Sequence, residues 1–212
     1  SQVIGKSSEE FAIHVKGLEG PAHDPRSGKA LGVTYATANR GMCHIHPLEG
    51  MAWDRGKLDW GMTKYGVPDP NGVERWDEEG KGSAVQLLQN GLCLPDVIGT
   101  CKFYMYCGIT LDHWADFIAA LTGWDIDGKE LLLAGERAIN LQRLFNIREG
   151  ITARDDFLPE RVRAVPAFGK YSAQVDCAVH DLDSMLHEYY QARGWDEKTG
   201  APGEEKLKEL GL

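Results

Sequence analysis

The sequence predicts a mostly α-helical fold with only minor, short strands. Residues 128–146 place apolar side chains three or four positions apart, as an amphipathic helix does. Residues 28–39 are small and almost uncharged, and residues 182–192 are amphipathic and end at the helix-stop pair Arg193-Gly194. Period-two alternation is sparse, so helix dominates.

The composition excludes some classes of partner. The 212 residues can bury a core without disulfides, in one or two domains. The chain has 23 basic and 32 acidic side chains and a net charge of −9. Nucleic acids and anionic membranes require clustered Lys and Arg, so we expect neither as a partner. No apolar run approaches the ~20 residues of a membrane span.

The cysteines and the first residue predict where the protein is located and whether the chain is part of a longer one. Five cysteines are an odd number without a regular disulfide framework, and no secretory leader opens the sequence. We therefore expect a reducing, cytoplasmic location. The chain begins with Ser1 rather than methionine, and we expect it to be a piece of a longer protein.

The N-terminal third has weaker local signals. Alternation over Glu9–Val15 predicts a strand, and breakers over Gly17–Arg26 predict a loop. The small residues of Gly28–Asn39 predict a helix that is packed on several sides. Residues 40–77 are rich in Gly and Pro and predict a long, functional or inter-domain connection.

Two helices are predicted next along the chain. Lys81–Leu94 would place Val85, Leu88 and Leu92 on one face and end at Pro95, because proline disfavours helical dihedrals in its predecessor. Leu111–Leu121 would be stopped by Gly123.

The C-terminal half carries the strongest helix signals. Asp127 and Glu130 resemble a capping box that opens the longest helix, Gly128–Asn146. Its predicted apolar face is Leu131, Ala134, Ala138, Leu141 and Phe145. Leu182–Ala192 and a short Glu204–Leu210 complete the helices.

One short motif carries the chemistry. Asp96, Gly99 and Cys101 form D-x-x-G-x-C after an apolar helical run. The glycine allows a sharp turn, and the motif can point a thiolate at a bound object. A [4Fe–4S] cluster needs four thiolates, commonly three of them from a compact run that this chain lacks. We therefore interpret the chain as one wall of a cofactor site. In the alternative interpretation, Asp96 only caps a helical turn and Cys101 is a small buried hydrophobic residue.

Several motifs in order carry a family resemblance. They are L-E-x-P-A-x-D-P-R at 18–26, Y-A-T-A-N-R-G at 35–41, D-x-x-G-x-C, G-E-R-A-I-N-L from 135, and D-x-M-L-x-E-Y-Y from 183. Together they resemble the C-terminal region of tungsten-containing aldehyde ferredoxin oxidoreductases, over roughly residues 10–212.

The resemblance implies an incomplete enzyme. Residues 1–212 would be the C-terminal helical part, with the N-terminal β part and most of the middle helical part absent. Family members hold tungsten between two pterin dithiolenes (tungstopterin) beside a [4Fe–4S] cluster, and both cofactors are expected only in the full-length protein. The remaining cluster cysteines should precede Ser1.

The resemblance also assigns roles to residues. Cys101 would be the fourth cluster ligand, and Asp96 would accept hydrogen bonds from a pterin. The backbone of Thr100 would complete pterin binding, and Arg40 would contact the pterin system. His44 matches a histidine near tungsten, where a neutral imidazole can move a proton during catalysis.

Two positions depart from the family pattern. His23 stands where relatives often have tyrosine, and its imidazole could also donate a hydrogen bond to substrate. Met42-Cys43 replaces the commoner small-acidic pair before His44. Cys43, His44 and His46 could instead suggest zinc, although no second ligand pair stands at finger or ribbon spacing.

The implied activity is oxidation of a small aldehyde to a carboxylic acid, with electrons passed to ferredoxin or a similar carrier. The rest of its own full-length chain would be the first partner, and a homo-oligomer is compatible with the sequence. Two alternatives stay open: a tungsten subunit of an aromatic acyl-CoA reductase, and a cofactor-free helical interaction domain.

Overall fold

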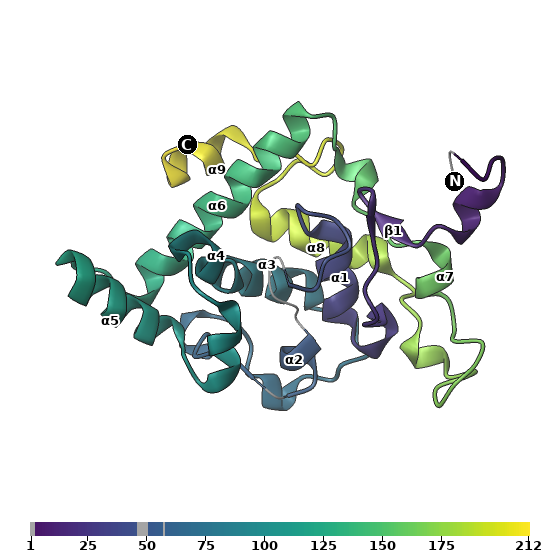
Figure 1. Ribbon diagram of the computed structural model, residues 1–212, viewed down its shortest axis with the longest axis horizontal. Helices are drawn as coiled ribbons and strands as arrows, with labels where there is room; N and C mark the ends of the chain where they lie inside the picture. The colour runs from purple at the N-terminus through teal and green to yellow at the C-terminus, as the bar shows by residue number, and fades with distance from the viewer. Residues whose placement is uncertain (1–2, 46–50, 57) are drawn as a thin grey trace.

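Three helices surround a central one in the computed structural model, which describes residues 3–45, 51–56 and 58–212. The central helix is α3 (Lys81–Leu92), and it contacts α8 (Leu182–Arg193), α6 (Gly128–Arg148) and α1 (Lys29–Thr37). In Figure 1, α6 runs across the molecule and α5 (Leu111–Thr122) projects at one end. The predicted mostly α fold is confirmed.

Helix α1 is enclosed, as its small residues predicted. All nine of its residues are buried, including Lys29, which is 1% exposed. The Lys29 ammonium donates to the carbonyl of Ala178 and lies 3.3 Å from a carboxylate oxygen of Glu78. Because this buried cation has both a carbonyl and a carboxylate partner, its burial does not destabilise the core.

The predicted strand over Glu9–Val15 is mostly wrong. Residues Ser8–Phe11 form a 3₁₀ helix (η1), and only His14–Val15 (β1) pairs, with Leu18–Glu19 (β2). Positive φ angles of 50° at Lys16 and 79° at Gly17 turn the chain back after Val15. The last hydrogen bond between the two strands is from the N–H of Gly20 to the carbonyl of Ile13, and Pro21 has no N–H with which to continue the ladder. The predicted loop over residues 17–26 therefore contains a strand and, at Pro25–Ser27, a 3₁₀ turn (η2).

The connection over residues 40–77 has more structure than its glycines and prolines predicted. It contains α2 (Met51–Asp54) and the 3₁₀ turns η3 (Thr63–Tyr65) and η4 (Pro70–Gly72). Asp54 is 1% exposed, accepts a hydrogen bond from the backbone N–H of Ala30 at 2.7 Å and pairs with the ammonium of Lys81. The connection is thus fastened to the ends of two core helices.

Pro95 begins a helix rather than ending one. Helix α3 ends at Leu92, and a short helix, α4 (Leu94–Ile98), starts with Pro95 in its first turn. Proline is tolerated there because a first-turn N–H has no intrahelical partner to lose. The buried apolar face of Val85, Leu88 and Leu92 is confirmed.

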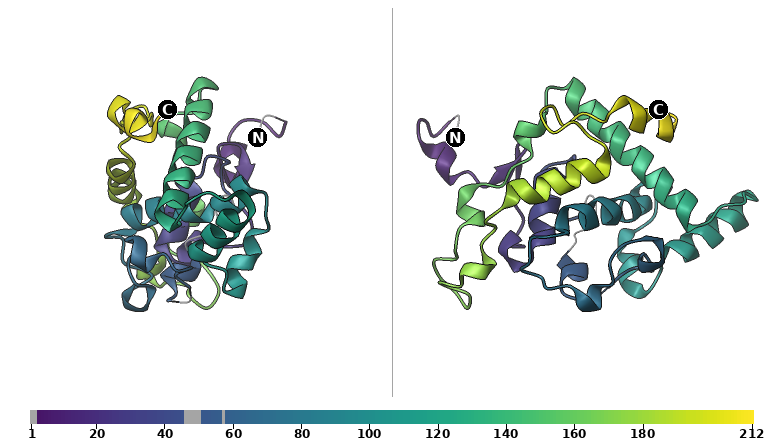
Figure 2. Two further views of the ribbon diagram at one scale, coloured as in Figure 1. Left: turned by 90° about the vertical axis from the view of Figure 1, so that its left-hand side faces the viewer. Right: turned by 180° about the vertical axis from the view of Figure 1, so that it is seen from behind.

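The later helices follow their capping signals closely. Gly123 ends α5 with φ 74°, and Gly194 ends α8 with φ 65°. Asp127 caps α6 by accepting from the backbone N–H groups of Lys129 and Glu130 at 2.8 and 3.0 Å. Helix α9 (Glu204–Leu210) packs on α6, as the two views in Figure 2 show.

The predicted apolar face of α6 is right in part. Leu131 is buried and Ala134 and Ala138 pack against the core, whereas Leu141 and Phe145 are 52% and 54% exposed. The helix is rotated so that it also buries Gly135, Ile139, Asn140 and Arg143. A Cβ at Gly135 would lie 1.8 Å from the carbonyl oxygen of Asn90 in α3, so the missing side chain lets the two helices touch. Close approach and polar partners, rather than apolar periodicity, set which face is buried.

The remainder of the chain is short helices and irregular segments. These are η5 (Lys102–Cys107), η6 (Ala153–Asp155), α7 (Glu160–Arg163) and η7 (Val175–Cys177). Within the described part of the chain, no helix is long and apolar enough to cross a membrane.

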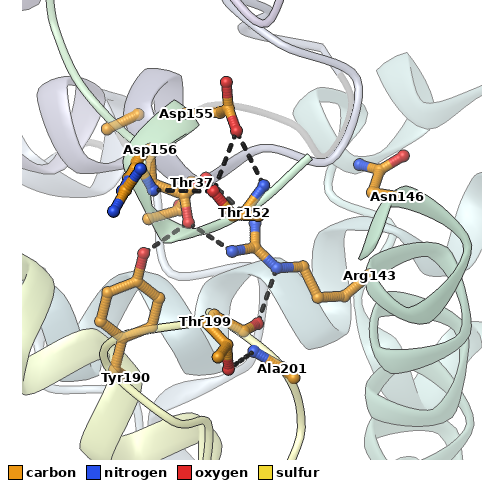
Figure 3. Close-up of polar contacts among 12 residues, drawn as sticks. Thr37, Arg143, Asn146, Thr152, Asp155, Asp156, Tyr190, Thr199 and Ala201 are labelled. Carbon is orange, nitrogen blue, oxygen red and sulfur yellow. Dashed lines mark hydrogen bonds and ion pairs between the residues drawn. The ribbon is translucent and has the colours of Figure 1, made fainter. Parts of the chain in front are cut away.

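A buried carboxylate joins four segments that are distant in sequence. Asp156 pairs with Arg143 of α6 and accepts a 2.5 Å hydrogen bond from the hydroxyl of Tyr190 in α8 (Figure 3). Its Oδ1 also lies 2.6 Å from the ammonium of Lys16, which donates to the carbonyl of Ala36 near the end of α1. Burial lowers the pKa of Lys16, and the neighbouring Asp156 opposes that shift.

Replacing Asp156 tests this network. Asp156→Asn should lower the free energy of unfolding by about 3–5 kcal/mol, because it leaves buried cations without a counter-ion. Tyr190→Phe, which removes one hydrogen bond to the carboxylate, should cost less, about 1.5–3 kcal/mol. Both are measured by urea denaturation.

The matched control is Asp116→Asn on the exposed side of α5, which should change stability by less than about 0.5 kcal/mol. An Asp156→Asn effect no larger than the control would show that the network does not hold these segments together.

Candidate functional site

The D-x-x-G-x-C motif forms a turn that presents its cysteine to the surface. Gly99 caps α4 in the left-handed region at φ 73°, and the N–H of Thr100 donates to the carbonyl of Pro95 at 2.9 Å. This C-terminal cap releases the chain into an extended Cys101, whose side chain is exposed. The alternative in which Cys101 is a buried hydrophobe is therefore wrong.

The cap limits how Thr100 could bind a cofactor. Its N–H is used within the cap, so the backbone group that could meet a pterin is its carbonyl oxygen. If the backbone of Thr100 binds a pterin, as predicted, its carbonyl oxygen would accept the hydrogen bond.

Apolar surface surrounds Cys101. Four exposed side chains lie within six residues of it in sequence, with 40–54% of their surface accessible: Val97, Phe103, Tyr104 and Tyr106. Exposed apolar groups gathered around a thiol are typical of a surface that another protein segment covers.

Lys102 connects this turn to the segment that carries His44. Its ammonium pairs with Oδ2 of Asp96 at 2.6 Å and also donates to the carbonyl of Ile45. Lys102 is 8% exposed, whereas the side chain of Asp96 is 32% exposed, so the ammonium is buried and the carboxylate stays open to solvent. Sequence analysis missed this residue, although its place directly after Cys101 was the available signal.

The two predicted catalytic histidines lie against each other. The ring centroids of His23 and His44 are 4.4 Å apart. The backbone of His23 is fixed by the buried Tyr35 of α1, whose hydroxyl donates to the His23 carbonyl at 2.9 Å. Burial lowers the pKa of His44, and the nearby His23 lowers it further. His44 is therefore a neutral imidazole at neutral pH, able to accept a proton.

Arg40 lines a hollow between the end of α1 and the C-terminal third of α6. Its Nη1 lies 3.7 Å from Sγ of Cys43. The hollow, of about 660 Å³, is also lined by Asn39, Leu141, Gln142, Phe145 and Asn146. The exposed apolar residues of α6 thus share a concave surface with the arginine predicted to contact a pterin.

The other cysteines differ in exposure. Cys93 is buried, and burial raises the pKa of its thiol to about 12, as for a thiol that only packs in the core. Cys177 is also buried. Cys107, in contrast, is exposed at the end of η5.

The described residues do not form a complete metal site. No group of three or more His, Cys, Asp or Glu side chains among them could hold a metal ion. His46, the third residue of the possible zinc set, lies outside the described residues. One exposed thiol beyond a tight turn fits a single ligand of a cluster whose other ligands come from elsewhere.

Comparison with known proteins identifies the family. The family described as "Aldehyde ferredoxin oxidoreductase, domains 2 & 3" matches residues 1–212. The chain belongs to the aldehyde ferredoxin oxidoreductase family. It is 37% identical over 206 residues to the tungsten-containing aldehyde ferredoxin oxidoreductase of Pyrococcus abyssi. It is 36% identical over 205 residues to that of Pyrococcus furiosus.

The chain represents part of these relatives. Each alignment covers 96% of the chain but 31% of the relative's length. A solved structure described as the active site complex BamBC of benzoyl coenzyme A reductase in complex with 1,5-dienoyl-CoA has a similar fold. Its TM-score is 0.65 at 19% identity, over 100% of this chain and 34% of the other.

The histidine pair predicts a titration. The pKa of His44 measured by NMR should lie below the ordinary value of about 6.5. Because the unfolded chain then binds this proton first, the contribution of His44 to stability should decline as pH falls below about 6.5. His23→Asn should raise the His44 pKa without restoring it fully, since burial is the larger cause.

His187→Asn on the exposed face of α8 is the control and should leave the His44 titration unchanged. A His44 pKa at or above 6.5 would contradict the described geometry.

Proposed function

We propose that this chain is the C-terminal part of a tungstopterin and iron–sulfur enzyme that oxidises aldehydes to carboxylic acids and passes the electrons to ferredoxin. The observation that carries the proposal is the exposed thiol of Cys101, turned outward by Gly99 beside the Asp96–Lys102 pair. Identities of 36–37% to aldehyde ferredoxin oxidoreductases support this chemistry over that of the fold relative at 19%.

The cofactor-binding roles follow from the groups that the turn presents. Cys101 would be one thiolate ligand of a [4Fe–4S] cluster, and Asp96, Arg40 and the Thr100 carbonyl would face a pterin. When bound, the tungsten centre would supply the two-electron acceptor, and the cluster would supply the route by which electrons leave for ferredoxin. Lys102 would orient the Asp96 carboxylate through their 2.6 Å ion pair, so that the carboxylate can accept hydrogen bonds from N–H groups.

The histidine pair would handle protons. Oxidising an aldehyde with one water gives a carboxylic acid, two protons and two electrons. The neutral His44 imidazole can accept one of these protons as the water oxygen bonds to the carbonyl carbon. His23, in ring contact with His44, would position it and could donate a hydrogen bond to the substrate oxygen.

The remaining polypeptide of the same protein would cover the apolar surface. The side chains around Cys101 and the α6 residues beside Arg40 are exposed on this chain, and a cofactor between them needs shielding from water. We expect the rest of the full-length chain to occupy both surfaces.

A substrate comparison on the full-length enzyme tests the reaction class. With a viologen dye as acceptor, aldehydes should reduce the dye and yield the acid. An aromatic acyl-CoA thioester with reduced dye is the comparison, and its dearomatisation without aldehyde turnover would overturn the proposed activity.

The two exposed cysteines offer a matched test of the cluster ligand. In the full-length protein, Cys101→Ser should abolish the normal [4Fe–4S] signal in electron paramagnetic resonance and reduce aldehyde oxidation at least 100-fold. Cys107→Ser, six residues further on, should leave both unchanged. Normal cluster spectra in Cys101→Ser would favour a helical domain that no longer binds the cluster.

A further inference from the structure

A second cavity lies at the other end of the molecule from α5 and the Cys101 turn. It has a volume of about 810 Å³ and forms between η2, the segment after α2, the segment before α3, and residues 161–171. Figures 1 and 2 show α7 and the loop after it at this end, with α5 at the opposite one. None of the residues proposed for cofactor or substrate contact lines it.

The cavity gathers positive charge on an acidic chain. Five cationic side chains line it, against one carboxylate: Arg26, Arg55, Arg75, Arg161, Lys170 and Asp24. The carboxylate of Asp24 is already paired with Arg26 through contacts of 2.7 and 2.9 Å. No ion pair within the described residues involves the other four cations, so they give the cavity a positive potential.

One of these cations is held against the aromatic wall of the cavity. The guanidinium of Arg75 stacks 4.1 Å from the centre of the Trp76 ring, and its Nη2 donates to the hydroxyl of Tyr171 at 3.4 Å. Both aromatic residues line the cavity, so Arg75 is positioned at its wall.

The rest of the wall is apolar. Residues 164–168 run as Ala-Val-Pro-Ala-Phe along the rim, and Phe168 is 87% exposed. The ring of Tyr171 meets that of Trp76 edge to face, with centroids 5.8 Å apart. A cavity of this size with a few convergent polar groups suits a small organic molecule rather than a macromolecule.

We propose that this cavity binds a small organic anion in which a phosphate or carboxylate is attached to an aromatic body. The oxyanion would accept hydrogen bonds from Arg75, with Arg55, Arg161 and Lys170 adding long-range attraction. The aromatic body would lie against Phe168 and the apolar rim. The site is separate from the proposed cofactor surface, so it does not depend on the proposed redox chemistry.

Calorimetric titration of the full-length protein tests the site with four probes. 1-Naphthyl phosphate and 1-naphthoate distinguish phosphate from carboxylate, and 1-naphthylmethanol and inorganic phosphate each lack one half of the ligand. At least one naphthyl anion should bind ten or more times tighter than either half-probe, and added salt should weaken it. Equal binding of the neutral alcohol would overturn the proposal.

Variants locate the binding. Arg75→Gln should weaken binding of the naphthyl anion roughly tenfold or more. Lys170→Gln, on an exposed loop, should weaken it about twofold without disturbing the fold.

Arg148→Gln is the matched control, because Arg148 is an exposed arginine at the end of α6 whose only ion pair among described residues is with Glu149. It should leave binding unchanged. If Arg75→Gln and Lys170→Gln bind the anion like the unaltered protein, the anion binds elsewhere and the assignment is wrong, whatever the aldehyde activity.

Discussion

The carboxylate of Asp156 is the interaction on which the arrangement of this chain depends. It lies outside any helix, yet it forms ion pairs with Lys16 of the hairpin and Arg143 of α6 and accepts a hydrogen bond from Tyr190 of α8. Lys16 extends the connection to the carbonyl of Ala36, one turn before the segment that leads to Arg40 and His44. A buried charge is costly unless it is fully partnered, so these segments can assemble in few other ways.

Much of the helical framework could be read from the sequence because its signals are local. Asp127 caps α6 by accepting from the N–H groups of Lys129 and Glu130, and Gly123 and Gly194 end helices with the positive φ that favours glycine. The buried face of α6 was not predictable in the same way. Gly135 is buried by contact with α3, and Arg143 by contact with Asp156, and neither contact is visible in the periodicity of one helix.

The candidate site also combines parts that a local motif predicts with parts that depend on tertiary contacts. Asp96, Gly99 and Cys101 lie within six residues, so a short motif can specify their turn and the exposure of the thiol. The approach of His23 to His44 depends on a hydroxyl in α1, and the link from Lys102 to Ile45 spans 57 positions. Such contacts arise from tertiary structure, and only the resemblance to a family pointed to the histidines beforehand.

The rotation of α6 has a consequence for handling the protein. By turning Asn140 and Arg143 inward, the helix leaves Leu141 and Phe145 facing water, on the same molecule that exposes Phe103 and Tyr104 near Cys101. Two such exposed apolar surfaces favour self-association, and co-expression with the remainder of the protein would cover both.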